Sequence, residues 1–108
     1  MQIIKDHIHF DGISAQDLAK EFGTPTYVYE GTRIRENYRR LFNAFQSKWP
    51  RFKIYYAVKS NSNPAIIKLL MEEGAGCDCA SANEILLAQK LGAKGEQILF
   101  SGNYLNDV

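Results

Sequence analysis

The chain has 108 residues, 45% of them hydrophobic, with 13 basic and 12 acidic side chains and a formal net charge of +1. This balance gives no electrostatic reason to expect nucleic acid or a membrane surface as a partner, and no apolar run approaches the roughly 20 residues that cross a bilayer. The start, MQIIKDHIHF, lacks the apolar core of a signal peptide, so we expect a cytoplasmic protein.

The amino-terminal segment, up to Glu30, predicts a strand, a short helix and a second strand. The stretch IIKDHIHFDG alternates and ends in Asp-Gly, as a strand closed by a turn does. SAQDLAKEFG predicts a helix with Ser14 as N-cap, Asp17 at the capping-box position and Gly23 as its stop. TPTYVYE is rich in residues of high β propensity and predicts another strand.

The stretch from Thr32 to Trp49 predicts an amphipathic helix. Its apolar side chains recur at helical spacing: Ile34, Tyr38, Leu41, Phe42 and Phe45. The remaining circumference carries four arginines, Arg33, Arg35, Arg39 and Arg40. Because acidic residues accompany them and the whole chain is nearly neutral, we expect a solvated helix face there and not a nucleic-acid patch.

The cysteines and histidines do not predict a metal site. Cys77 and Cys79 are one residue closer than a zinc-type pair, and no second pair completes a site. A disulfide between them would be strained, so we expect two reduced, apolar side chains in a strand. His7 and His9 share one face of the first predicted strand, but no third ligand accompanies them.

From Phe52 onward the chain repeats a strand and a helix. FKIYYAVKS, CDCAS and QILFSGN predict strands, and NPAIIKLLMEEG and SANEILLAQKLG predict helices between them. The helices carry clear boundary residues, namely Asn63, Pro64 and Gly74 for the first, and Ser81, Glu84 and Gly92 for the second.

The three strand ends are evenly spaced along the sequence. The separation from Lys59 to Ala80 equals that from Ala80 to Ser101, and such a regular stride is typical of consecutive β/α units. Apolar strands linked by helices form parallel sheets covered on their faces. The fold class is therefore α/β, and we interpret the units as the first part of a (β/α)8 TIM-type barrel. An independent three-stranded domain is the alternative, although it would carry an exposed edge strand.

Lys59 ends the first predicted strand of this repeat. Because side chains alternate along a strand, Lys59 should share a face with Ala57, while Tyr56 and Val58 pack against the helices. Lys59 would then point into the barrel at the carboxyl end of its strand, where the active sites of such barrels lie. The small Ala57 leaves room for a flat ligand. A partly desolvated lysine suits Schiff-base formation, because only the neutral amine attacks a carbonyl.

Four segments carry a resemblance to a known family. TPTYVYE, YYAVKSNSNP, GCDCASANEI and ILFSGN, in this order and spacing, resemble the fold-type III pyridoxal-phosphate-dependent amino-acid decarboxylases, most closely the diaminopimelate decarboxylases. The resemblance runs from about Gly12 to the end of the chain. It implies the amino-terminal part of an alanine racemase-like barrel, with residues 1–29 as a lead-in associated with a second β domain and residues 30–108 as a partial barrel that binds the cofactor.

The same resemblance implies roles for three residues. Lys59 would hold pyridoxal 5'-phosphate as a Schiff base and act in catalysis, and Ala57 and Asp78 would lie at the cofactor. The reaction implied is decarboxylation of meso-diaminopimelate to L-lysine, in lysine biosynthesis. Relatives of this family are homodimers, so we expect a homodimer when the protein is full length. An amino acid would be the substrate, with no nucleic-acid or membrane partner.

One segment departs from the diaminopimelate pattern. Those enzymes usually have D-V-V-S-G-G-E where this chain has DCASANE, and the D-C-A-S form is more like ornithine decarboxylase. An ornithine- or arginine-type decarboxylase is therefore an alternative. Two further alternatives are a non-decarboxylating barrel protein that binds pyridoxal phosphate, such as a racemase or carrier, and a non-enzymatic α/β module that kept only the scaffold.

Overall fold

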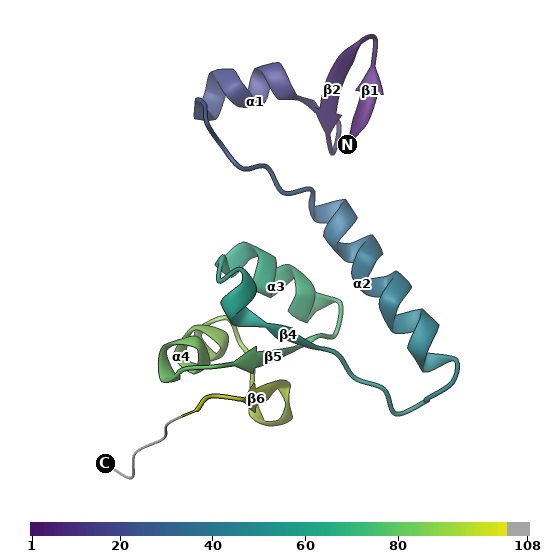
Figure 1. The fold of residues 1–108 in the computed structure, drawn as a ribbon. Coiled ribbons are helices and arrows are strands. Elements are labelled where there is room, and N and C mark those ends of the chain that lie inside the picture. Colours follow the sequence, from purple (N-terminus) through teal and green to yellow (C-terminus); the bar gives the residue numbers. More distant parts are fainter. Residues whose placement is uncertain (104–108) are drawn as a thin grey trace.

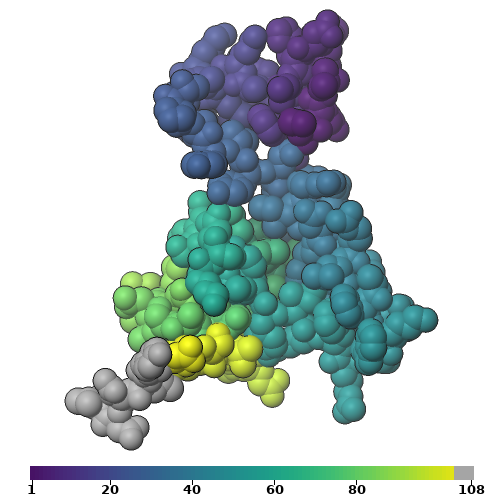
Figure 2. Space-filling view, viewed as in Figure 1, coloured from purple at the N-terminus to yellow at the C-terminus, as the bar shows by residue number. Residues whose placement is uncertain are grey.

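A computed structural model describes residues 1–103, which form two separate three-stranded sheets (Figure 1). The first sheet is antiparallel and lies near the amino terminus, and the second is parallel and lies in the carboxyl-terminal half. Figure 2 shows the first sheet and its helix as a lobe at the top of the view, joined to the larger part that holds the parallel sheet. No helix among residues 1–103 is long and apolar enough to cross a membrane.

The amino-terminal segment is a hairpin and not the single strand that the sequence predicted. Strand β1 (Gln2–Ile4) pairs antiparallel with β2 (His7–Phe10), and β3 (Ile13–Ser14) pairs with β2. The turn between β1 and β2 places Lys5 and Asp6 at positive φ, 48° and 64°, as tight two-residue hairpin turns require. Lys5 and Asp6 are both polar and interrupt the apolar alternation, and this break marks the turn that the single-strand prediction missed.

The first predicted helix is confirmed. Helix α1 (Ala15–Phe22) begins where the Ser14 hydroxyl accepts the backbone N–H of Asp17 at 3.1 Å, and it ends at Gly23 with a φ of 79°. The positive φ explains why glycine stands at this stop.

The strand predicted over TPTYVYE is wrong for the part of the chain that the structure describes. Residues 24–30 pair with no other strand in it, and Tyr27 is 91% exposed. A strand is completed by hydrogen bonds to a neighbour, and residues 1–103 place no neighbour beside this segment. Despite its high β propensity, this segment forms an extended connection between α1 and the next helix.

The long amphipathic helix is confirmed as α2 (Gly31–Gln46). It packs along α3 (Pro64–Glu72). The buried Tyr38 of α2 forms one apolar cluster with Ile66 and Leu70 of α3. Figure 1 shows α2 running from the amino-terminal lobe alongside the parallel sheet.

The arginines of α2 do not form the wholly solvated face that we predicted. Arg35 donates to Glu72 at 2.7 Å and to Glu73 at 2.8 Å, and Arg39 donates to Glu73 at 2.5 and 2.7 Å. The Glu73 side chain is only 8% exposed. These ion pairs tie α2 to the end of α3, and helical periodicity could not show them because they join residues far apart in the sequence.

We expect Glu73 to make the α2–α3 contact sensitive to acid. The hydrogen bonds from Arg39 and then Arg35 lower the pKa of Glu73 from 4.5 to about 2. A carboxylate with a depressed folded-state pKa stabilises the fold above its unfolded pKa, and this stability is lost as pH falls from about 4.5 to about 2. Glu73→Gln should therefore lower the urea midpoint at pH 6 and have much less effect at pH 2.5.

The matched control is Glu72→Gln, because Glu72 is 50% exposed and, among residues 1–103, pairs with Arg35 alone. This change should lower the midpoint less than Glu73→Gln at pH 6. If Glu73→Gln lowered the urea midpoint equally at both pH values, the role assigned to these ion pairs would be wrong.

The parallel sheet has three strands in the order β4 (Tyr55–Ala57), β5 (Gly76–Cys79) and β6 (Ile98–Phe100). Its register follows the even spacing in the sequence, since Ala57 pairs with Asp78 and Asp78 pairs with Leu99 across equal lengths of chain. Helix α3 connects β4 to β5, and α4 (Ala82–Lys90) with the short helix η2 (Gly95–Gln97) connects β5 to β6. The predicted βαβαβ order is confirmed.

The boundary residues of both helices act as predicted. Asn63 accepts the N–H of Ala65 at 2.9 Å, and Ser81 accepts that of Glu84 at 3.3 Å. The Glu84 carboxylate in turn accepts the N–H of Ala80 at 2.6 Å, one residue earlier than a standard capping box. The stops, Gly74 and Gly92, both have a φ of 102°.

Helices cover one face of the parallel sheet. On that face lies a core of fully or almost fully buried side chains: Val58, Ile67, Cys77, Cys79, Ala88 and Ala93. Cys77 and Cys79 are unbonded thiols within this core, as predicted, and burial raises the pKa of Cys79 to about 11. The opposite face carries Ala57 and Asp78, and Leu99 on the edge strand is 48% exposed. This open face is where the candidate site lies.

Candidate functional site

Lys59 lies on a one-turn helix and not on the strand itself. Strand β4 ends at Ala57, and residues Val58–Ser60 form the short 3-10 helix η1. The predicted alternation therefore breaks after Ala57, and Lys59 does not share its face as a strand residue. The physical reason is local, because the Ser60 hydroxyl donates to the Ala57 carbonyl at 2.7 Å and curls the chain.

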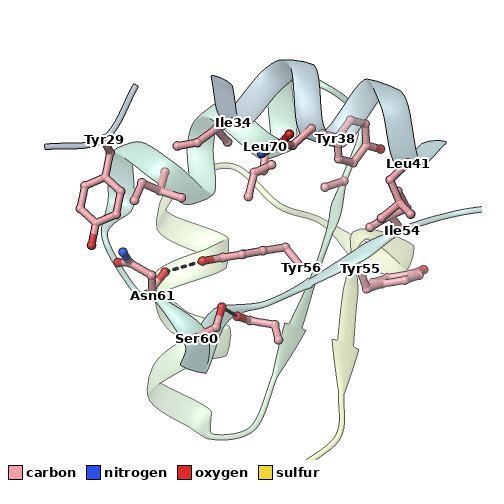
Figure 3. Close-up of a pocket in the computed structure, with 14 residues that line it drawn as sticks. Tyr29, Ile34, Tyr38, Leu41, Ile54, Tyr55, Tyr56, Ser60, Asn61 and Leu70 are labelled. Atoms are coloured by element: carbon pink, nitrogen blue, oxygen red, sulfur yellow. Dashed lines mark hydrogen bonds between the residues drawn. The ribbon is translucent and has the colours of Figure 1, made fainter. Parts of the chain in front are cut away.

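Several contacts fix the turn that carries Lys59, and Figure 3 shows the one between Tyr56 and Asn61. Val58 is completely buried in the core below it. The Tyr56 hydroxyl donates to the Asn61 carbonyl at 3.0 Å, and the Asn61 side chain accepts the N–H of Asn63 at 3.0 Å. Asn63 then caps α3, so the turn is held at both ends.

Sequence reasoning identified Asn63 as a cap but missed the roles of Ser60 and Asn61, although the run of serine and asparagine after β4 was a usable signal. Such residues hydrogen-bond to nearby backbone groups and favour turns. The result is a lysine on a well-supported turn at the carboxyl end of a parallel strand.

The Lys59 side chain is exposed among the described residues. The partial desolvation that we predicted for it is therefore not present there, because helices cover only the other face of this three-stranded sheet. An exposed amine at this edge can still react with an aldehyde from solution.

The structure brings Ala57 and Asp78 together. They are register partners on β4 and β5, both half-buried, at the end of the sheet where Lys59 also lies. Ala57 presents only a methyl group, which leaves space on the open face. Asp78 places a carboxylate beside that space, where it can accept hydrogen bonds or face a cation.

Ser101, which sequence reasoning did not select, contacts Asp78 directly. Its hydroxyl donates to Asp78 Oδ1 at 2.5 Å. The equal spacing of Lys59, Ala80 and Ser101 was the signal that could have identified it, because it puts Ser101 at the same end of its strand as Lys59.

The open face is filled at the opposite end of the strands. The Tyr55 ring lies over Gly76, where an added Cβ would come within 2.5 Å of Tyr55 Cε1. The Tyr55 hydroxyl and Lys53 Nζ both donate to the Glu96 carbonyl, at 2.6 and 2.8 Å. A ligand on this face therefore has room near Ala57 and Asp78 and not near Gly76.

An apolar cleft of about 510 Å³ lies between α2, α3 and β4 (Figure 3). Its lining includes Tyr38, Leu41 and Leu70 and reaches Ala57, but it includes neither Lys59 nor Asp78. We therefore place the chemistry at Lys59 and not in this cleft. No group of three metal-binding side chains occurs in residues 1–103.

Comparisons with known proteins match this chain to pyridoxal-dependent decarboxylases. The profile of a family described as "Pyridoxal-dependent decarboxylase, pyridoxal binding domain" matches residues 34–107. Diaminopimelate decarboxylase from Methanothermobacter thermautotrophicus is 46% identical over 103 residues, which are 95% of this chain and 24% of that protein. The diaminopimelate decarboxylase of Aquifex aeolicus is 43% identical over 88% of this chain and 22% of its own length.

Solved structures give the same result. Diaminopimelate decarboxylase from Methanocaldococcus jannaschii, crystallised with L-lysine, has a TM-score of 0.89 and 36% identity over 95% of this chain and 25% of that one. Lysine decarboxylase from Selenomonas ruminantium has a TM-score of 0.73 and 29% identity over 94% of this chain and 26% of its own. The chain thus spans about a quarter of the length of the relatives it matches.

Proposed function

Because the chain belongs to the pyridoxal-dependent decarboxylase family through its pyridoxal-binding domain, we propose that it is the amino-terminal part of a diaminopimelate decarboxylase. The full protein would convert meso-diaminopimelate to L-lysine and carbon dioxide, in lysine biosynthesis. The observation that carries this proposal is the 46% identity to a diaminopimelate decarboxylase across 95% of the chain. The family also supports the predicted fold, the first β/α units of an alanine racemase-like (β/α)8 barrel.

The residues at the open face fit the aldehyde end of pyridoxal 5'-phosphate. Lys59 offers an exposed amine on a fixed turn, and Ala57 leaves room for a flat ring beside it. When bound, this cofactor supplies a conjugated ring that accepts the electron pair left by the departing α-carboxylate.

Each of the three residues has a separate task in this proposal. Lys59 Nζ would hold the cofactor covalently, and the same amine could give a proton to the substrate. Asp78 would present a carboxylate that can accept hydrogen bonds at the same end of the sheet. Ala57 keeps the space open.

The proposal extends to the organisation of the whole protein. Residues 1–29 would be a lead-in that associates with a second β domain, and residues 30–108 would be the first part of the barrel. Positions 104–108 of that second range lie outside the described residues. The full protein would be a cytoplasmic homodimer with an amino acid as substrate and with no nucleic-acid or membrane partner.

One segment favours a second candidate function. The sequence Asp78-Cys79-Ala80-Ser81 at the end of β5 is more like the ornithine enzymes, so an ornithine- or arginine-type decarboxylase is the alternative. A racemase or carrier that binds the same cofactor would keep Lys59 but release no carbon dioxide.

The substrate is tested by carbon dioxide release from the full-length protein loaded with pyridoxal phosphate. We expect release from meso-diaminopimelate to be at least about tenfold faster, in kcat/KM, than from ornithine, arginine or lysine, because a site that binds the distal groups of one substrate loses about 1.4 kcal/mol or more with the others. Faster release from ornithine or arginine would favour the second candidate. Binding of the cofactor without release from any of them would favour the racemase or carrier.

A further inference from the structure

Ser101 lies at the same end of the parallel sheet as the proposed cofactor lysine. It follows β6 directly, as Ala80 follows β5, and it continues the even spacing that begins at Lys59. The carboxyl ends of parallel strands meet at one edge of a sheet. Ser101 and Asp78 therefore lie at the end of the sheet that carries Lys59, on which the proposed function depends.

Two hydrogen bonds attach Ser101 to β5. Its backbone N–H donates to the Cys79 carbonyl at 2.9 Å, and its hydroxyl donates to Asp78 Oδ1 at 2.5 Å. The backbone bond extends the pairing of β5 and β6 by one residue and sets the position of the serine Cα. The hydroxyl then reaches the carboxylate without further movement of the chain.

The residue after Ser101 also limits where the serine can lie. A Cβ at Gly102 would come within 2.8 Å of Phe100 Cε2 and 2.7 Å of the Ala80 carbonyl oxygen. Only glycine allows the chain to pass this close to the end of β5. The contact between Ser101 and Asp78 is thus supported from both sides of the serine.

The contact has a consequence for the Asp78 side chain. A carboxylate attached through a single bond can rotate, and a hydrogen bond to one oxygen fixes the direction of the other. Oδ1 is held by Ser101, so the orientation of Oδ2 relative to the space above Ala57 is set.

We propose that Ser101 is a positioning residue for the cofactor site: its hydroxyl holds the Asp78 carboxylate in one orientation at the end of the sheet that carries Lys59. This inference rests on the proposed function, because it concerns the same site. In this inference Ser101 acts through Asp78.

The test uses the full-length protein and three variants. Ser101→Ala removes the hydroxyl, Ser101→Thr keeps it, and Ser47→Ala removes a hydroxyl at the end of α2, where it donates to the Ala44 carbonyl. Carboxyl carbon-13 NMR of protein labelled at aspartate, without cofactor, reports on Asp78 directly. The Asp78 signal is assigned by its loss in Asp78→Asn.

We expect the chemical shift of the Asp78 carboxyl carbon at neutral pH to differ from wild type in Ser101→Ala, and to stay near the wild-type value in Ser101→Thr and Ser47→Ala. The affinity for pyridoxal phosphate, measured by absorbance, should fall about tenfold in Ser101→Ala, because hydrogen bonds to charged groups are worth about that factor or more. Ser101→Thr should restore most of this loss. In an Asp78→Asn background, Ser101→Ala should cause no further loss.

Two results would overturn the inference. One is an Asp78 carboxyl chemical shift that Ser101→Ala does not change. The other is a changed chemical shift with wild-type cofactor affinity, which would leave Ser101 a purely structural role. If wild-type protein bound no cofactor, the proposed function would fail instead, and the NMR measurement would still decide whether Ser101 controls the orientation of Asp78.

Discussion

Lys59→Ala should abolish covalent attachment of pyridoxal phosphate to the full-length protein and lower carbon dioxide release at least about 100-fold. The reason is that alanine has neither the amine that bonds to the aldehyde nor a group that can return a proton. The measurement is borohydride reduction in the presence of cofactor, followed by peptide mapping. In wild type the label should be found on the peptide that contains Lys59.

Two other lysines serve as controls for this experiment. Lys53 and Lys68 are exposed, one before β4 and one on α3, and Lys53 Nζ is engaged with the Glu96 carbonyl. Their alanine variants should retain the label and the visible absorbance of the bound cofactor. A label on either lysine in wild-type protein would show that the assignment of Lys59 is wrong.

Gly76→Val should destabilise the fold by about 1–3 kcal/mol, even though valine has a high β propensity. Gly76 lies in β5 under the Tyr55 ring, and an added Cβ would come within 2.5 Å of Tyr55 Cε1 and 3.0 Å of the Gln97 carbonyl oxygen. To make room, Tyr55 would have to give up its hydrogen bond to Glu96. Urea unfolding of the full-length protein measures the loss.

The same crowding predicts a rescue. In a Tyr55→Ala background the ring is absent. Gly76→Val should therefore lower the free energy of unfolding much less there than it does when Tyr55 is present. The difference between the two costs is the coupling free energy of the pair. Equal costs in both backgrounds would mean that the Tyr55 ring does not limit the space at Gly76.

The carboxyl-terminal half of this fold could be predicted well because its signals are local and regular. Capping residues such as Asn63 and Ser81 mark helix starts through their own backbone contacts. The equal spacing of the strand ends indicated the register of Ala57 with Asp78, since each unit repeats the same length. These features need no knowledge of distant neighbours.

The failures have a different physical origin. The strand expected over TPTYVYE depends on a partner, and residues 1–103 supply none. The ion pairs of Arg35 and Arg39 with Glu73 depend on how two helices cross, which periodicity along one helix does not specify. Both cases were decided by packing between segments and not by the segments themselves.

The candidate site shows the same division between local features, which the sequence predicts, and contacts between distant segments, which it does not. Lys59 was placed at the correct end of the sheet, but the turn that carries it was predicted as strand, because one hydroxyl contact from Ser60 outweighed the alternation. Ser101 was overlooked because its contact with Asp78 joins residues of two different strands. A sequence pattern can therefore locate the end of the sheet at which the site lies. The hydrogen bonds within the site must be read from the structure.

The regular register of the parallel sheet also bears on how the chain folds. The pairing of β4 with β5 and that of β5 with β6 each close a loop of equal length, so the two pairings cost about the same entropy. Parallel sheets usually fold slowly because they join distant segments, but here every pairing is between consecutive units. The first pairing needs no residue after Cys79, so β4, α3 and β5 can associate during synthesis, before β6 has left the ribosome.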